Sequence, residues 1–321
     1  MKAFLIHLGK NMWHKQDTWT LIGEENSGYC KKLACDKETW RKVTDFLPAC
    51  GFDTLLIDMG EGVRLDRHPE LAIEGSWSKE EFMAELERLR SIGLTPLPKF
   101  NFSCGHSAWL KDYAYMVGTE TYDKVCKDVV EETIEMFGNP EFFHLGMEEE
   151  TLKNQRVQPV AIVRSPLKKI RDCNFLFDVC RSKGVRPWIW VDPDTIEAFG
   201  GEEMFQEHIG KDVLISNWYY GRFQTFAPGS PFGDKPHDIA CKELYIKLGE
   251  WGYEQVPTCS TWSTPGNDKG TMKFCKANVK EGSVQGYMTA SWLTTNQEMY
   301  YGLLHDAHIF GCAYKSVYGE E

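Results

Sequence analysis

Eight short apolar runs recur along the chain, and each is followed by a stretch with helical periodicity. A run that is apolar at nearly every position is typical of a strand buried on both faces of a parallel sheet. The runs are residues 3–9, 54–60, 94–100, 141–147, 186–192, 212–220, 255–262 and 284–292. Eight strand–helix units in 321 residues predict an α/β protein with a single-domain (β/α)8 TIM barrel spanning 1–321. A doubly wound open sheet is the alternative, but no GxGxxG or P-loop supports it.

The clearest predicted helix spans residues 78–93, "SKEEFMAELERLRSIG". Ser78 is a suitable N-cap and Gly93 a suitable stop at the carboxyl end. Phe82 and Leu86 lie four residues apart, so both fall on one face of the helix. Further helices are predicted near 38–50, 119–137, 165–184, 195–209, 235–250, 270–281 and 296–311.

Polar residues gather where the predicted strands end. In a TIM barrel the catalytic groups lie at the carboxyl ends of the strands, so these side chains are expected to meet. They are Asp58 after the second strand, Lys99, Asn101 and His106 after the third, Glu148 and Glu149 after the fourth, and Asp192 after the fifth. The sequence therefore predicts one acidic active site at this end of the barrel.

The stretch "FHLGMEEE" (143–150) places three glutamates directly after the fourth strand. Two carboxylates in one pocket raise at least one pKa, which suits proton donation to a leaving oxygen. Because successive residues of an extended chain alternate sides, only two of the three are expected to reach the site, with Glu150 a solvated bystander. Retaining glycosidases hold acid and nucleophile ~5 Å apart across the scissile bond. Adjacent glutamates favour a different division of catalytic roles. One is the acid, and the other positions a substrate group that attacks the same substrate molecule internally.

His106 is expected to hydrogen-bond one of these carboxylates, with Asp58 orienting the imidazole. The predicted catalytic residues are therefore Glu149, Glu148, His106 and Asp58. The chain is also rich in tryptophan, with 11 residues, and indole planes pack well on the CH faces of sugars. Of Trp188 and Trp190, one is expected in the core and one in the helix layer. The predicted substrate-binding residues are Trp190, Asp192, Trp218, Tyr219, Tyr220, Trp262, Trp292, Lys99 and His144.

Charge and composition exclude several other classes of protein. The net charge is −11 without a basic stripe, which argues against a nucleic-acid partner. No stretch approaches the ~20 apolar residues of a membrane span, and the N-terminus has too short an apolar run for a signal peptide. Eleven cysteines without CxxC pairs favour a reducing cytoplasm over a disulfide framework. His144, Glu148 and Asp192 lack the tight spacing of a metal site, so neither metal nor cofactor is expected. The expected partner is a carbohydrate, and a homo-oligomer is left open.

The order of these motifs resembles the family 20 glycoside hydrolases, the β-N-acetylhexosaminidases. The counterparts are Asp58, Arg64, "HPEL" (68–71), "GLTPLPKFNFSCGHS" (93–107) and "HLGMEE" (144–149). The resemblance is good over roughly residues 50–150 and weak beyond them. It implies that Glu149 is the general acid and that Glu148 replaces the aspartate that orients the 2-acetamido group. It further implies that His106 and Asp58 support the acid, and that Tyr219 or Tyr220 hydrogen-bonds the acetamido oxygen.

Several family positions differ in this chain. Glu148 is one methylene longer than the family's aspartate, and Lys99 replaces an acid of the third strand. The arginine of the first strand is absent, because "HLGKNMW" offers only His7, Lys10 and Asn11. The acid after the tryptophan of the last strand is missing, and so is the usual N-terminal accessory domain. These differences imply that the chemistry is kept while the sugar recognised has changed.

Three hypotheses follow for the function. The first is a retaining exo-glycosidase that acts on a β-linked N-acetylhexosamine (GlcNAc or GalNAc) through substrate-assisted catalysis. The second is a glycosidase of a related barrel family with another sugar and ordinary acid and nucleophile roles, using Asp192. The third is a sugar-binding barrel that has lost catalysis, which the absent arginine and Lys99 would suit.

Overall fold

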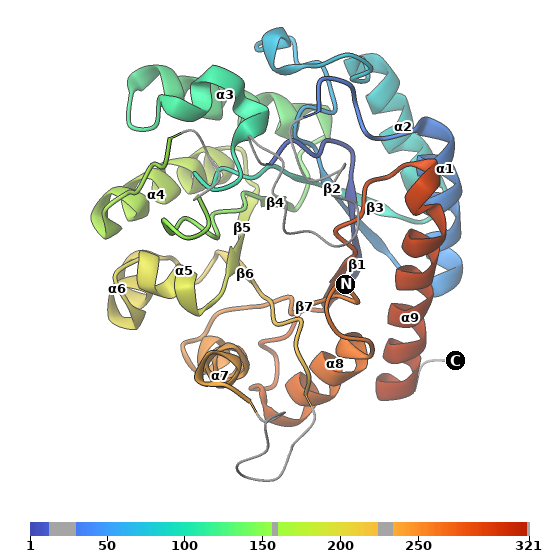
Figure 1. The fold of residues 1–321 in the computed structure, drawn as a ribbon, viewed down its shortest axis with the longest axis vertical. Coiled ribbons are helices and arrows are strands. Elements are labelled where there is room, and N and C mark those ends of the chain that lie inside the picture. The colour runs from blue at the N-terminus through green and yellow to red at the C-terminus, as the bar shows by residue number, and fades with distance from the viewer. Residues whose placement is uncertain (13–29, 156–159, 224–233, 320–321) are drawn as a thin grey trace.

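The computed structural model describes residues 1–12, 30–155, 160–223 and 234–319, and it confirms the predicted TIM barrel. Eight parallel strands lie in the order β6-β5-β4-β3-β2-β1-β8-β7, with helices around them (Figure 1). The strands are β1 (Lys2–His7), β2 (Thr54–Asp58), β3 (Thr95–Lys99), β4 (Phe142–His144), β5 (Arg186–Val191), β6 (Leu214–Asn217), β7 (Thr258–Cys259) and β8 (Tyr287–Ala290).

The sheet closes on itself between β6 and β7. Two isolated parallel bridges, Ile215–Gln255 and Trp218–Thr258, join these strands. The backbone N–H of Val256 also donates to the carbonyl of Ile215 at 2.8 Å. A closed cylinder leaves no free sheet edge, so the alternative of an open doubly wound sheet is wrong.

The helices follow the predicted pattern with one difference. They are α1 (Lys37–Phe46), α2 (Lys79–Ser91), α3 (Glu120–Met136), α4 (Pro166–Ser182), α5 (Pro193–Ala198), α6 (Glu202–His208), α7 (Pro236–Glu250), α8 (Asn267–Asn278) and α9 (Tyr300–Tyr318). Ser78 caps α2 as expected, because its hydroxyl accepts from the Glu81 N–H at 3.2 Å. The helix predicted at 195–209 is split into α5 and α6. Gly200 and Gly201 separate them with φ angles of 95° and 99°, which end a right-handed helix.

Two apolar layers are separated by the sheet. Along β1, Phe4 and Ile6 face the helices, whereas Ala3 and Leu5 face the barrel interior, as the two-residue period of a strand requires. The same period places both Trp188 and Trp190 in the interior. The expectation that one of them faces the helix layer is therefore wrong, since residues two apart on a strand share a face. None of the described helices combines the length and apolar composition needed to cross a bilayer.

Candidate active site

The turn after β4 carries the three glutamates in an unusual backbone conformation. Gly146, Met147 and Glu149 all have φ in the left-handed region, at 75°, 83° and 54°. Non-glycine residues rarely adopt this region, and such strain gathers at functional sites. The turn sends the glutamates in different directions. Glu148 is buried, the Glu149 side chain is 34% exposed, and Glu150 is buried on another side of the turn.

Glu148 and Glu149 hold the imidazole of His106 between them. Nδ1 of His106 lies 3.1 Å from Oε1 of Glu148, and Nε2 lies 3.1 Å from Oε2 of Glu149. Burial alone would lower the pKa of His106, but hydrogen bonds and charges from both glutamates raise it to about 10. The ring is therefore an imidazolium at neutral pH, and it donates to both carboxylates. Sequence reasoning placed these three residues together, and the structure brings them into one chain of hydrogen bonds.

The two carboxylate oxygens of Glu148 differ in their hydrogen bonding. Asn101 Nδ2 donates to Oε1 at 2.7 Å and lies 3.2 Å from Nδ1 of His106. Burial favours the neutral acid, but His106 offsets this and lowers the pKa of Glu148 below its ordinary value. Oε2 is buried and makes no hydrogen bond within the described residues. Because an unsatisfied buried oxygen is costly, this atom is suited to accept a donor from a bound molecule.

The protonation of His106 has a measurable consequence for stability. Its folded pKa of about 10 lies above the 6.5 of the unfolded chain, so the stabilisation is complete below pH 6.5 and is lost as the pH rises through 10. We expect the difference in unfolding free energy between the native protein and His106→Gln to shrink steadily from pH 6.5 to pH 10. Urea denaturation at several pH values measures this difference. A difference that stays constant with pH would mean that the ring is neutral.

Asp58 has other partners than the one expected. Lys99 Nζ donates to Asp58 Oδ2 at 2.7 Å, and Nδ1 of His7 lies 3.2 Å from the same oxygen. Burial would raise the pKa of Asp58, but the charge of Lys99 and the His7 hydrogen bond lower it below the ordinary value. Lys99 is fully buried, and a buried ammonium needs such a counter-ion. The prediction that Asp58 orients the ring of His106 is wrong, because glutamates occupy both ring nitrogens.

Glu150 is not the expected solvated bystander. Its side chain is only 3% exposed and forms ion pairs with Arg164 and, at 3.0 Å, with Lys169. Burial would raise the pKa of Glu150, but the two cations lower it to about 2. The third glutamate is therefore a buried anion that faces away from His106.

A row of aromatic rings lies beside the glutamates at the barrel mouth, and Trp190, its innermost member, is buried. The rings of Trp190 and Trp292 lie 6.1 Å apart, and Tyr220 lies 6.4 Å from Trp292. Trp218 continues the row, 5.3 Å from Tyr220. Burial, together with the charges of both glutamates, raises the pKa of Tyr220 well above its usual range. Its hydroxyl and the Trp292 N–H are close enough to interact, but neither makes a hydrogen bond of ordinary geometry within the described part of the chain.

The other predicted substrate-binding residues separate into two groups. His144 and Asp192 lie at the glutamate end of the barrel, since the ring of His144 is 4.7 Å from that of Trp190. Burial, with smaller contributions from the charges of Asp194 and Glu149, raises the pKa of Asp192 to about 6, while its side chain caps α5 by accepting from Thr195 N at 2.8 Å. Tyr219 instead packs in the outer layer against Phe223. Trp262 is 45% exposed at the rim.

Comparison with solved structures gives the same fold. The β-N-acetylhexosaminidase from Bacteroides fragilis aligns over 97% of this chain and 65% of its own, with 13% identity and a TM-score of 0.61. The Flavobacterium johnsoniae chitobiase aligns over 86% and 45%, with 14% identity and a TM-score of 0.57. A variant of the Streptomyces plicatus β-hexosaminidase, in complex with the product GlcNAc, aligns over 97% and 63%, with 10% identity and a TM-score of 0.59.

The chain has the fold of the family 20 hexosaminidase catalytic domains. It spans about two thirds of the length of the first of these structures and less than half of the second. No protein-family model matches the sequence, and no curated protein does. The sequence motifs at 50–150 thus predicted the correct fold.

In this hexosaminidase fold, sequence reasoning missed the part played by several residues near the site. Asn101 donates to Glu148 and lies beside Nδ1 of His106, and its position two residues after the end of β3 was the available signal. Lys10 donates from Nζ to the carbonyl of Trp292 at 3.1 Å, and burial lowers its pKa to about 8. Glu61 accepts from the backbone N–H groups of Lys10 and Asn11 at 2.8 and 3.0 Å, and burial raises its pKa to about 7.

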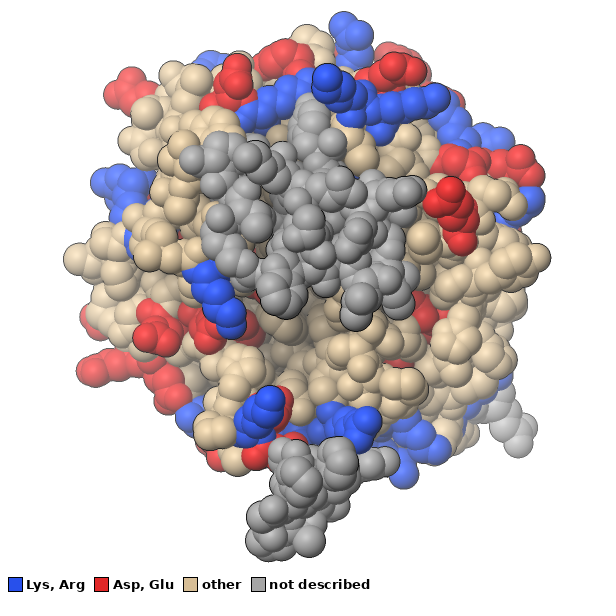
Figure 2. Space-filling view, viewed as in Figure 1, with Lys and Arg blue, Asp and Glu red and all other residues tan. Residues whose placement is uncertain are grey.

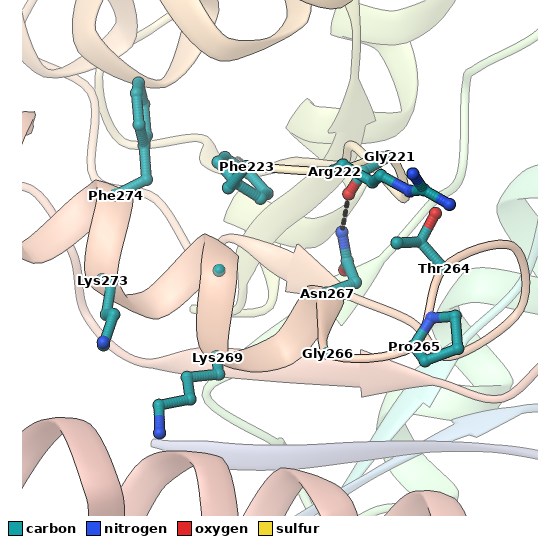
Figure 3. Close-up of a pocket in the computed structure, with 11 residues that line it drawn as sticks. Gly221, Arg222, Phe223, Thr264, Pro265, Gly266, Asn267, Lys269, Lys273 and Phe274 are labelled. Atoms are coloured by element: carbon teal, nitrogen blue, oxygen red, sulfur yellow. Dashed lines mark hydrogen bonds between the residues drawn. The ribbon is translucent and has the colours of Figure 1, made fainter. Parts of the chain in front are cut away.

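A separate groove of about 790 Å³ lies beside the segments that follow β6 and β7 (Figure 3). It runs between residues 221–223, residues 264–266 and the start of α8, and Arg222, Lys269 and Lys273 line it. Asn267 ties its walls together by donating to the carbonyls of Tyr219 at 2.7 Å and Gly221 at 2.9 Å. None of the predicted site residues lines this groove.

Figure 2 shows a molecular face that is hollowed near its centre, with mostly uncharged residues below the hollow. The charged side chains visible on this face lie mostly toward its edge. Among the described residues, no group of three or more His, Cys, Asp or Glu side chains is arranged to hold a metal ion. The described site brings together two carboxylates, the imidazole of His106 and a row of aromatic rings.

Proposed function

We propose that this protein is a retaining exo-glycosidase that removes a β-linked N-acetylhexosamine through substrate-assisted catalysis. The observation that carries the proposal is the Glu148–His106–Glu149 cluster at the mouth of a barrel with the hexosaminidase fold. The structural neighbours support the sugar class, because they include β-N-acetylhexosaminidases and one complex with GlcNAc.

Glu149 is proposed as the general acid. It is the more exposed of the two glutamates, so its carboxyl can reach a glycosidic oxygen. The three groups titrate as a unit, and a proton held near His106 Nε2 and Glu149 Oε2 is the one donated to the leaving oxygen. Donation of this proton leaves Glu149 ionised and His106 neutral, with the remaining ring proton on Nδ1, which faces Glu148 at 3.1 Å. In the second half of the reaction, the same carboxylate takes a proton from the attacking water.

Glu148 is proposed to hold the acetamido group. Its open Oε2 accepts the acetamido N–H, which aims the carbonyl oxygen of the substrate at the anomeric carbon. That oxygen forms the new bond as the leaving oxygen departs, and the cyclic oxazolinium carries a positive charge beside the anionic Glu148. Water then opens the ring on the face that the leaving group occupied, which gives retention of configuration.

The proposal is tested with paired nitrophenyl substrates that differ only in the 2-acetamido group. We expect hydrolysis of a β-N-acetylglucosaminide or β-N-acetylgalactosaminide, no hydrolysis of the matching β-glucoside or β-galactoside, and a first product of β configuration by NMR. Glu148→Ala, which lacks the carboxylate proposed to hold the acetamido group, serves as the low-activity control. Equal hydrolysis of the sugars without the acetamide would instead favour an ordinary nucleophile such as Asp192. Binding without turnover of either class would favour a sugar-binding barrel.

A further inference from the structure

A buried ion cluster lies directly behind the turn that carries the two glutamates. Arg164 contacts both oxygens of Glu150, with Nε 3.2 Å from Oε2, and Lys169 Nζ lies 3.0 Å from the same oxygen. The side chains of Glu150, Arg164 and Lys169 are 3%, 4% and 1% exposed. Removing one member of such a buried ion cluster leaves an uncompensated charge, which is costly. The cluster is therefore a rigid support for the residues it contacts.

This cluster joins the two segments that build the site. The N–H of Cys104, two residues before His106, donates to Oε1 of Glu150 at 3.0 Å. Lys169 Nζ also donates to the carbonyl of Met147 at 2.8 Å, just before Glu148. The Ser103 hydroxyl donates to the carbonyl of Glu148. Segment 103–106 and turn 146–150 are thus fastened to each other and to α4.

The turn needs such fastening because of its backbone conformation. Met147 and Glu149 both lie in the left-handed region, which costs on the order of 1–3 kcal/mol for each non-glycine residue. The segments also touch closely, since a Cβ on Gly105 would lie 2.4 Å from the carbonyl oxygen of Glu149. Release of one anchor would let the turn relax away from His106.

We infer that Glu150 is a positioning residue whose carboxylate holds turn 146–150 against segment 103–106, and thereby sets the distances from His106 to Glu148 and Glu149. Its effect on turnover rests on the proposed function, whereas its effect on the geometry around His106 does not. Glu150 touches none of the reacting groups, so it acts through the backbone that carries them.

Glu150→Gln tests this role because the amide keeps the volume but has one acceptor oxygen. That oxygen cannot serve Arg164, Lys169 and the Cys104 N–H together. If Glu150→Gln does not fold, Glu150→Gln/Lys169→Met removes one charge of each sign and leaves Arg164 with Asp172, which lies 3.3 Å away. Asp172→Asn is the matched control, because it also removes a carboxylate from Arg164 but contacts neither site segment.

The first measurement is the NMR titration of the His106 ring. Glu148 and Glu149 face its nitrogens, and Asn101 lies beside Nδ1. We expect its pKa to fall by about one unit or more in Glu150→Gln and to stay at the native value in Asp172→Asn. An unchanged pKa in Glu150→Gln, or equal changes in both variants, overturns the inference.

The second measurement is steady-state kinetics at a temperature where all variants are folded. A misplacement of about 1 Å at a catalytic group can cost 10²-fold, so we expect kcat of Glu150→Gln to fall about 10- to 100-fold with KM within about twofold. Asp172→Asn should keep the native kcat. A rise in KM with native kcat contradicts positioning. If the native protein hydrolyses no hexosaminide, the proposed function fails, and the titration still decides the role of Glu150.

Discussion

Replacing Glu149 by glutamine is expected to lower kcat about 10²–10⁴-fold on hexosaminides with poor leaving groups, and much less on nitrophenyl glycosides. A poor leaving oxygen needs the proton that Glu149 supplies, whereas a nitrophenolate leaves without it. Glutamine suits the test because it keeps the size of the side chain and tolerates the φ of 54° no worse than glutamate. The measurement is kcat across aryl glycosides of graded leaving-group pKa.

A matched control is Glu87→Gln, which changes an exposed glutamate on α2. It should leave the rate unchanged across the whole series. Equal loss in Glu149→Gln for good and poor leaving groups would falsify the role of this residue as the acid. It would then serve binding or the geometry of the turn instead.

Glu148→Ala is expected to keep the affinity for the intact sugar but to lower kcat by about 10²-fold or more. Removing one group that stabilises transition-state charge typically costs 10²–10³-fold. The variant should also bind a thiazoline inhibitor more weakly, because that compound mimics the cyclic intermediate. Inhibition constants for the thiazoline and for GlcNAc, measured side by side, separate the two effects.

Glu148→Gln provides a second variant that leaves no cavity and should show the same split. Sugar and thiazoline affinities that fall together would mean that Glu148 serves ground-state binding. Recovery of Glu148→Ala by azide, with a glycosyl azide of inverted configuration, would identify Glu148 as a direct nucleophile. Asp192→Asn completes the set, because it should lose most activity only if Asp192 is the nucleophile.

The barrel was predictable because strands buried on both faces are apolar at nearly every position, as "TLLID" in β2 is. The meeting of His106 with Glu148 and Glu149 followed from their places at neighbouring strand ends. The alternation of side chains along a strand also predicts the positions of Trp188 and Trp190. They lie two residues apart and share the interior face.

The orientation of the three glutamates could not be predicted in the same way. Alternation fails there because Met147 and Glu149 have positive φ, and neither residue type indicates such a conformation in a sequence. The burial of Glu150 depends on Arg164 and Lys169, which come from a later loop and helix. Likewise, the partner of Asp58 is Lys99, which comes from the next strand and meets Asp58 only inside the closed barrel.

The pairing of β1 with β8 also constrains the order in which the chain can fold. Lys2 pairs with Tyr287, so this contact joins residues 285 positions apart. During synthesis β1 can pair with β2 early, but its other edge stays open until β8 has left the ribosome. The mouth of the barrel, where Lys10 meets Trp292, is therefore assembled among the last parts of the molecule. A nascent chain that stops before β8 leaves backbone N–H and C=O groups of this β1 edge unpaired, and such an open edge is prone to pair with other chains.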